Sequence, residues 1–217
     1  TRKSLEEQGK LRMLASAKRK NPMTLKEAFS VDGENSLYNP ILLQEQLDKL
    51  SWGEKRTEYG DLVWKDGYEF ERPIKDASGN ISGYEINELE WIPNPKGDYE
   101  KVKGWTPKNP NSVVKRTEHY LPNDDKQNAI GCDPFKYDKT KDNRKSDCAA
   151  YAFQAEDLLD KENPYNEMFV MNYVNRASTT DIQYNDVLKM AWYCGCQILF
   201  ERNVDGWKKY LQTEKCS

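Results

Sequence analysis

The clearest pattern of hydrophobic and polar positions lies between residues 127 and 217. Four mostly apolar runs of strand length occur there, bounded by polar or turn-forming residues, at 129–132, 147–154, 168–174 and 197–201. Before the last run, apolar residues recur every three or four positions, which predicts an amphipathic helix carrying Tyr184, Val187, Leu188, Ala191 and Trp192. Gly195 is expected to end this helix, and a further helix is expected to begin near Trp207. The order of strand, strand, strand, helix, strand and helix predicts an α/β fold with a mixed sheet flanked by helices.

The rest of the chain shows two other patterns. Residues 1–50 have helical features, including the capping-box spacing of Thr24 and Glu27 and the helix-opening pair Asn39-Pro40. Residues 51–126 are β-like. Alternation at residues 68–71 predicts a strand, which the turn Asp66-Gly67 would join to residues 60–64 as a hairpin. Further β features are a turn at residues 78–80 and strands at 84–86 and 90–92. We therefore predict a helical N-terminal segment (1–50), a β-rich auxiliary region (51–126) and a core domain (127–217).

Composition excludes several classes of protein. Hydrophobic residues make up 37% of the chain and aromatic residues 12%, which is enough to build a core and argues against full disorder. No stretch approaches the roughly 20 apolar residues of a membrane-spanning helix, and no leader suggests secretion. The five cysteines lack metal-finger spacing, so we expect reduced thiols that mostly fill the core of a cytoplasmic protein. The single histidine, His119, argues against a Ser-His or Cys-His hydrolase, and we expect it on the surface or in a loop.

The net charge of −3 is not that of a protein built around nucleic acid, so contacts with DNA would have to come from local patches. Three stretches are locally basic: residues 1–20, residues 101–117 and residues 136–145. The last of these carries Lys136, Lys139, Lys141, Arg144 and Lys145. For each stretch the alternative to DNA binding is an ordinary solvated face.

Two carboxylates close predicted strands of the core domain. Asp133 follows the first strand and Glu201 ends the fourth. Ligand sites of open α/β sheets gather at the carboxyl ends of strands, so these two side chains converge if the strands are neighbours. Converging carboxylates repel unless a cation bridges them, and oxygen ligands suit Mg²⁺ or Mn²⁺. A two-metal site of this kind would hydrolyse a phosphodiester. The alternative is that Asp133 opens a turn before Pro134 and that Glu201 pairs with a nearby Lys or Arg.

Three segments resemble a known family. Residues 129–134 (Ala-Ile-Gly-Cys-Asp-Pro) look like the first strand of the nuclease domain of a tailed-bacteriophage large terminase subunit, which has a ribonuclease-H-like fold. Residues 198–203 (Ile-Leu-Phe-Glu-Arg-Asn), followed by Gly206, Trp207 and Leu211, are similar to that family's fourth strand with its glutamate. Residues 21–29 (Asn-Pro-Met-Thr-Leu-Lys-Glu-Ala-Phe) are similar to the segment where the packaging motor joins the nuclease. The resemblance spans most of the chain and is weakest over 51–125.

The resemblance implies a two-metal-ion endonuclease that cuts concatemeric viral DNA during genome packaging into phage heads. Asp133 and Glu201 would be catalytic and bind Mg²⁺ or Mn²⁺, Asp147 would be an auxiliary metal ligand or the ion-pair partner of Lys145, and the basic side chains of residues 136–145 would hold DNA phosphates. The implied partners are double-stranded DNA, the portal protein and the small terminase subunit, in the cytoplasm of an infected bacterium and without a membrane. No Gly-x-x-x-x-Gly-Lys-Ser/Thr motif occurs, so the ATPase half is absent. The family's third carboxylate is expected beyond Ser217, which would leave this fragment weakly active or inactive.

Two other functions fit parts of the sequence. The basic stretches 1–20 and 101–117 and the aromatic middle region also suit a non-catalytic module that docks DNA or a portal ring. Another ribonuclease-H-like nuclease, such as a resolvase or transposase, would keep the metal site and change the substrate. The Glu27-Ala28-Phe29 segment favours the terminase over this last alternative.

Overall fold

The computed structural model describes residues 56–123, 127–135, 147–200 and 205–216, together with residues 4, 8–10, 13, 14, 17 and 47. The chain divides into two compact units, Thr1–Arg56 and Thr57–Ser217. In the first unit, Leu14 is buried and its N–H donates a helical hydrogen bond to the carbonyl of Lys10 (3.0 Å). The capping box at Thr24 and the helix start at Asn39 lie outside the described residues.

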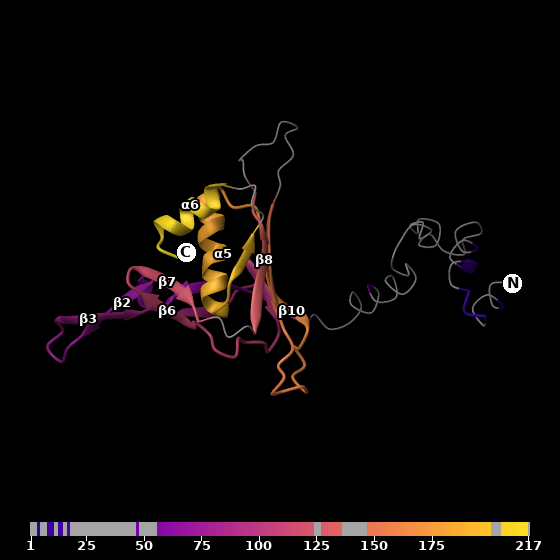
Figure 1. Cartoon of the computed structure of the whole chain (residues 1–217), viewed down its shortest axis with the longest axis horizontal. Coiled ribbons are helices and arrows are strands. Elements are labelled where there is room, and N and C mark those ends of the chain that lie inside the picture. The colour runs from indigo at the N-terminus through magenta and orange to yellow at the C-terminus, as the bar shows by residue number, and fades with distance from the viewer. Residues whose placement is uncertain are drawn as a thin grey trace. The chain divides into compact units, whose positions relative to one another are not determined.

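A seven-stranded sheet forms the framework of the second unit (Figure 1). Its strands are β1 (Thr57–Trp64), β4 (Leu89–Pro93), β5 (Tyr99–Val102), β8 (Asn128–Asp133), β9 (Cys148–Gln154), β10 (Met168–Asn175) and β11 (Ile198–Phe200). They lie in the order β11-β8-β9-β10-β5-β1-β4. β11 runs parallel to β8, and every other neighbouring pair is antiparallel. The unit is therefore of the mixed α/β class, as predicted, and three strands of the predicted auxiliary region belong to the same sheet as the predicted core.

Two β-hairpins extend this framework. One consists of β2 (Glu71–Lys75) and β3 (Ile81–Ile86), and it projects away from the sheet (Figure 1). Its turn forms where predicted, because the Asp76 carboxylate accepts hydrogen bonds from the backbone N–H groups of Ser78 (2.8 Å) and Asn80 (2.9 Å). The other hairpin consists of β6 (Val113–Arg116) and β7 (His119–Pro122), and His119 is exposed on it, as expected.

The predicted hairpin between residues 60–64 and 68–71 is wrong. A short 3-10 turn, Lys65–Gly67, does follow β1, but β2 begins only at Glu71. β1 pairs with β4 and β5 instead, so the β2–β3 hairpin is an excursion between two strands that are neighbours in the sheet.

The buried Asn87 side chain explains this departure. Its Nδ2 donates to the carbonyl oxygens of Lys65 (2.9 Å) and Tyr68, and its backbone N–H donates to the carbonyl of Phe70 (2.7 Å). These bonds satisfy backbone groups that a strand ladder would otherwise satisfy. The Phe70 ring then packs edge-on against Trp192, with the ring centroids 5.6 Å apart.

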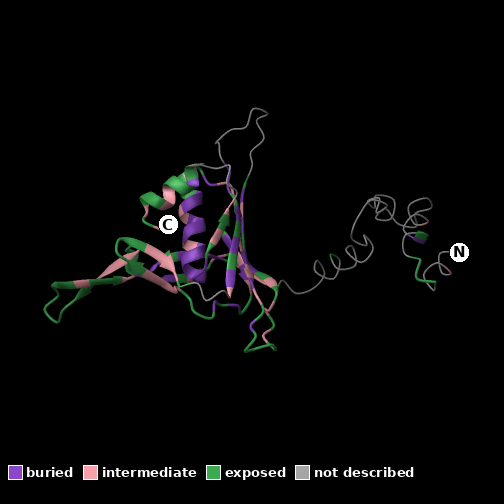
Figure 2. Ribbon diagram, in the orientation of Figure 1, coloured by how far each residue is buried: buried purple, intermediate pink, exposed green. Residues whose placement is uncertain are grey.

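Helices α5 (Thr180–Cys194) and α6 (Asp205–Thr213) lie on one side of the sheet (Figure 1). The Thr179 hydroxyl caps α5 by accepting a hydrogen bond from the N–H of Ile182 (3.4 Å). The helix ends at Gly195, whose φ of 61° is a left-handed conformation that glycine adopts without a steric penalty. Most of α5 is buried against the sheet (Figure 2), and both its predicted face and its predicted end are confirmed.

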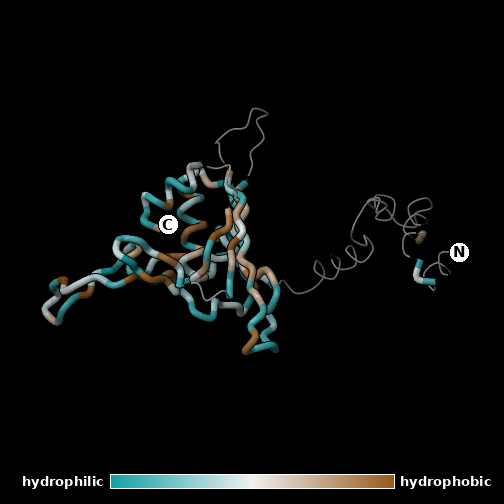
Figure 3. Tube along the Cα trace, in the orientation of Figure 1, coloured by the Kyte–Doolittle hydropathy of each residue, from teal (hydrophilic) through white to brown (hydrophobic). Residues whose placement is uncertain are grey.

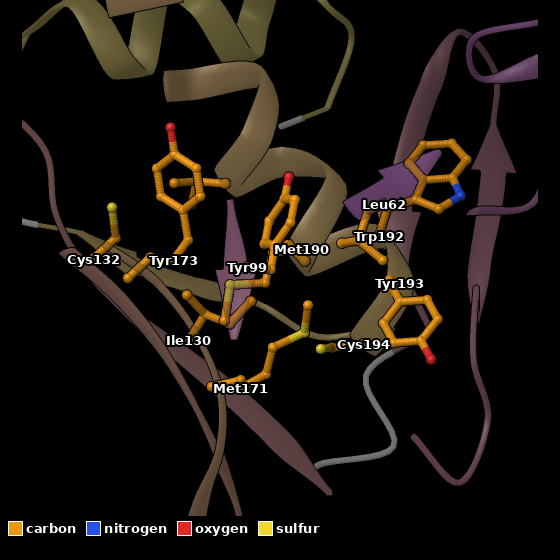
Figure 4. Packing of buried hydrophobic residues seen from close by; sticks show 14 of the residues in the cluster. Leu62, Tyr99, Ile130, Cys132, Met171, Tyr173, Met190, Trp192, Tyr193 and Cys194 are labelled. Atoms are coloured by element: carbon orange, nitrogen blue, oxygen red, sulfur yellow. The ribbon is translucent and has the colours of Figure 1, made fainter. Parts of the chain in front are cut away.

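The core fills the space between α5 and the sheet (Figure 4). This core includes Ile130 and Cys132 of β8, Tyr173 of β10, and Met190 and Trp192 of the helix. All five cysteines are free thiols, and the four buried ones confirm the prediction that they mostly fill the core: Cys132, Cys148, Cys194 and Cys196.

Hydrophobic residues lie along the sheet strands and α5, interrupted by hydrophilic positions (Figure 3). Within the part of the chain that the structure describes, no helix is both long enough and apolar enough to cross a membrane.

Candidate functional site at the end of β8

Asp133 is the last residue of β8, and its side chain is exposed. Cys132, directly before it, is buried in the core that α5 covers. Successive side chains of a strand point to opposite faces of the sheet. Asp133 therefore lies on the face away from α5, at the carboxyl end of a strand whose neighbours are β9 and β11.

The backbone that follows Asp133 is held in place by α5. The side chain of Gln183, which is fully buried, accepts a hydrogen bond from the N–H of Phe135 (3.3 Å) and donates one to its carbonyl (2.8 Å). The Arg176 guanidinium lies over the Phe135 ring, 3.8 Å from its centroid. These contacts fix the chain two residues beyond the candidate carboxylate. Sequence reasoning missed Gln183, whose only signal was its place beside Tyr184 on the predicted helix.

Asp147 lies at the same edge of the sheet as Asp133. β8 and β9 are antiparallel, and Asp133 pairs with Ala149, two residues after Asp147. The carboxyl end of β8 therefore meets the start of β9. Asp147 is exposed, so the structure brings two accessible carboxylates to one edge. Lys145, the alternative partner predicted for Asp147, lies outside the described residues.

The Cys148 thiol beside this edge stays protonated. A hydrogen bond between Cys148 and Cys132 raises the pKa of Cys148 far above its ordinary value, and burial and the negative charges of Asp133 and Asp186 raise this pKa further. Only a thiolate is a good metal ligand. The donors that this edge offers to a cation are therefore carboxylate oxygens.

A third carboxylate, which the sequence analysis missed, belongs to the buried face of α5. Burial raises the pKa of Asp186, and the Lys189 ammonium, 3.8 Å from the carboxylate, lowers it in part. The Tyr173 hydroxyl donates to the Asp186 carboxylate (3.1 Å), and the Tyr99 hydroxyl donates to the Asp186 carbonyl (2.9 Å). The available signal was the position of Asp186 next to Val187, within the predicted apolar face. Its contacts make Asp186 a link between helix and sheet.

Three lysines of the basic stretch 101–117 form ion pairs within the protein. Lys101 is buried, with its ammonium 2.6 Å from Glu58, and so does not belong to a solvated face. Two other lysines of the stretch also form ion pairs: Lys108 with Asp157 (2.7 Å) and Lys115 with Glu71 (2.6 Å). These three lysines are therefore poor candidates for phosphate contacts.

Several predicted site residues lie outside the described residues: Glu201, Lys136, Lys139, Lys141, Arg144 and Lys145. Among the residues that are described, no three His, Cys, Asp or Glu side chains gather closely enough to hold a metal ion. What the structure places together is Asp133 and Asp147 at one edge, on a strand pair anchored by α5.

Comparison with known proteins returns no match to any protein-family model, curated protein or solved structure.

Proposed function

We propose that this chain is the nuclease portion of a viral DNA-packaging enzyme, with a ribonuclease-H-like fold and a metal site formed by Asp133 and Glu201. The observation that carries the proposal is the pairing of β11 with β8. The two strands are parallel neighbours, and Phe200 pairs with Cys132. Each candidate carboxylate directly follows one of these partners in the sequence. If the parallel pairing of β11 with β8 continued by one residue beyond Phe200 and Cys132, Glu201 would pair with Asp133.

The connectivity of four strands supports the fold proposed. β8, β9 and β10 are antiparallel and follow one another in sequence, and β11 returns beside β8 after the helix α5. Two of the three segments that carry the terminase resemblance include β8 and β11 and continue toward α6. In this reading, β5, β1 and β4 extend the sheet on the far side of β10.

The donors at this edge fit a hard divalent cation. Asp133 and Asp147 are exposed carboxylates, whereas the neighbouring Cys148 thiol is buried and protonated. Oxygen donors of this kind select Mg²⁺ or Mn²⁺ over softer metals. When bound, such a metal supplies activation of a water and stabilisation of the leaving oxygen of a phosphodiester.

The chain's own residues would attract the cation, hold the site in position and bind DNA. Asp133 and Glu201 hold the charge that attracts the cation, and Gln183 keeps the backbone after Asp133 in position. Asp147 adds negative charge at the same edge. The lysines of residues 136–145 would bind backbone phosphates, which positions DNA without reading its sequence.

The test combines metal binding with cleavage by the full chain. We expect Mn²⁺ to raise the melting temperature saturably, because ligands that bind the folded state stabilise it, and to support at most weak nicking of supercoiled plasmid. Asp133→Asn and Glu201→Gln should each abolish the thermal shift and lower nicking to the level of a metal-free reaction. Glu118→Gln, which changes an exposed carboxylate on the β6–β7 turn, is the matched control and should behave as the wild type.

Retention of both the Mn²⁺ shift and nicking by the Asp133 and Glu201 variants would refute the proposed site. A wild-type chain that Mn²⁺ does not stabilise would refute it as well. Circular dichroism checks that the variants are folded, so that a lost thermal shift or lost nicking reports on the substituted carboxylate.

One observation favours a second candidate function, a non-catalytic docking module. The projecting β2–β3 hairpin exposes large apolar side chains, including Ile81 (57% exposed) and Tyr84 (65% exposed). Isolated two-stranded hairpins gain little stability in water, so such an arm is suited to a partner's surface. Salt-sensitive DNA binding with no effect of metal would favour this module over the nuclease.

A further inference from the structure

The sheet face away from α5 carries exposed apolar side chains on most of its strands. Alternation along the strands assigns this open face the side chains opposite to the buried core residues. Seven of them are large, apolar and exposed: Tyr59, Val63, Ile92, Tyr151, Phe169, Val174 and Leu199. Phe169 is 64% exposed and Leu199 68%. Exposed apolar groups spread across one sheet are typical of a surface that binds a partner.

A depression of about 290 Å³ lies in the open face where β9, β10, β5 and β1 meet. Tyr151, Phe169 and Met171 form apolar parts of its wall, and Glu100 is its one charged lining residue. The Glu100 carboxylate is held in place by hydrogen bonds from the Thr57 hydroxyl (2.5 Å) and the Asn172 amide (3.3 Å). The depression therefore combines apolar walls with a fixed negative charge.

The remaining charge on the open face has the same sign. Alternation places Asp61 and Glu90 on this face, together with Glu100 and, at its edge, Asp133. Among the described strand residues assigned to the face, none is Lys or Arg. Away from the proposed metal site at the Asp133 edge, these carboxylates would repel DNA phosphates, and a second copy of the chain would bring carboxylates against carboxylates.

We infer that the open face binds an amphipathic, basic segment of a partner protein, with an arginine or lysine side chain anchored in the depression beside Glu100. The apolar face of such a segment would cover side chains such as Phe169 and Leu199. The long stem of the anchor fits the apolar walls, and its charge meets the Glu100 carboxylate. The rings of Tyr151 and Phe169, whose centroids lie 5.8 Å apart, offer π faces to the same cation. This inference does not depend on the proposed nuclease site.

Binding of two fluorescent helical peptides to the full chain tests this assignment. One peptide has a leucine face and a face of arginines, and its twin has every arginine replaced by glutamate. We expect the arginine peptide to bind at least tenfold more tightly at low salt. Glu100→Gln, which keeps the shape of the depression and removes its charge, should weaken that binding at least fivefold.

Two further variants separate the open face from other apolar surface. Phe169→Ser should weaken binding of the arginine peptide by a similar factor. Tyr84→Ser on the β2–β3 hairpin is the matched control, and it should leave this binding unchanged. Glu100 and Phe169 are not residues of the proposed metal site, so Glu100→Gln and Phe169→Ser should keep the Mn²⁺ thermal shift of the wild type, and the two proposals fail separately. Near-UV circular dichroism checks the fold of each variant.

Equal binding of the two peptides would overturn the inference, and so would wild-type affinity in both Glu100→Gln and Phe169→Ser. Sedimentation velocity provides a further check. Concentration-dependent dimers that Phe169→Ser abolishes would assign the open face to a second copy of the chain and would also overturn the inference.

Discussion

Substituting Gln183 by leucine should separate the end of β8 from α5. The change preserves most of the side-chain volume but removes both hydrogen bonds to Phe135. Gln183 is fully buried, and Phe135 is 4% exposed. Water therefore has little access to the N–H and carbonyl groups that lose their partner, and both backbone groups would be left unsatisfied.

The expected loss of stability follows from those two groups. A buried donor or acceptor that loses its partner costs about 1–3 kcal/mol. Local relaxation and the better burial of leucine offset part of the sum. We expect Gln183→Leu to lower the free energy of unfolding by about 2–4 kcal/mol.

Urea unfolding followed by tryptophan fluorescence and circular dichroism gives this free energy directly. Gln212→Leu is the control, because Gln212 is exposed on α6 and should change stability by no more than about 0.5 kcal/mol. Hydrogen exchange adds a local readout, since the Phe135 amide should lose its protection in the variant. A loss below about 1 kcal/mol, with the Phe135 amide still protected, would refute the argument that Gln183 holds the end of β8.

Two further substitutions test the packing around the sheet. Asp186→Asn should become more stable relative to the wild type as pH rises above about 3.8. Because the pKa of Asp186 is raised in the folded state, ionisation of this carboxyl lowers the stability of the wild type, and the variant does not undergo this loss. Urea unfolding across this pH range measures the effect, with Glu118→Gln as the control. A difference in the free energy of unfolding between Asp186→Asn and the wild type that does not change with pH would contradict the prediction. Gly97→Ala should lower the free energy of unfolding by about 1–3 kcal/mol, since the added Cβ would lie 2.3 Å from the carbonyl oxygen of Gly60. Gly131→Ala is the control, because a Cβ added at Gly131 meets nothing within 4 Å, and its melting temperature should stay near that of the wild type. Equal melting temperatures for the two glycine variants would contradict the predicted clash at Gly97.

The sequence predicted the elements of residues 127–217 well because their periodicity reports burial directly. The four apolar runs became β8, β9, β10 and β11, and the stripe from Tyr184 to Trp192 became the buried face of α5. The prediction failed at residues 68–71. There the alternation was real, but the buried Asn87 took the backbone hydrogen bonds that a strand needs.

Some residues at and near the candidate site were predicted from the sequence, and others were missed. Asp133 and Asp147 were predicted from sequence because each stands at a strand terminus, which local pattern marks. Gln183 and Asp186 could not be found in that way, because their partners lie far away in the chain: Phe135 for Gln183, and Tyr99 and Tyr173 for Asp186. Lys101 is a similar case, since local sequence placed it in a basic stretch and the fold buried it beside Glu58.

Local sequence was enough to predict the mixed α/β class, the free and mostly buried cysteines, and the ends of β8 and α5. These features depend on neighbouring residues, whose spacing and turn chemistry are written along the chain. Local sequence did not show that β1, β4 and β5 extend the same sheet, or that one face of this sheet is apolar and acidic. Strand pairing brings together residues from distant parts of the chain, and alternation shows that a strand has two faces without showing what covers each of them.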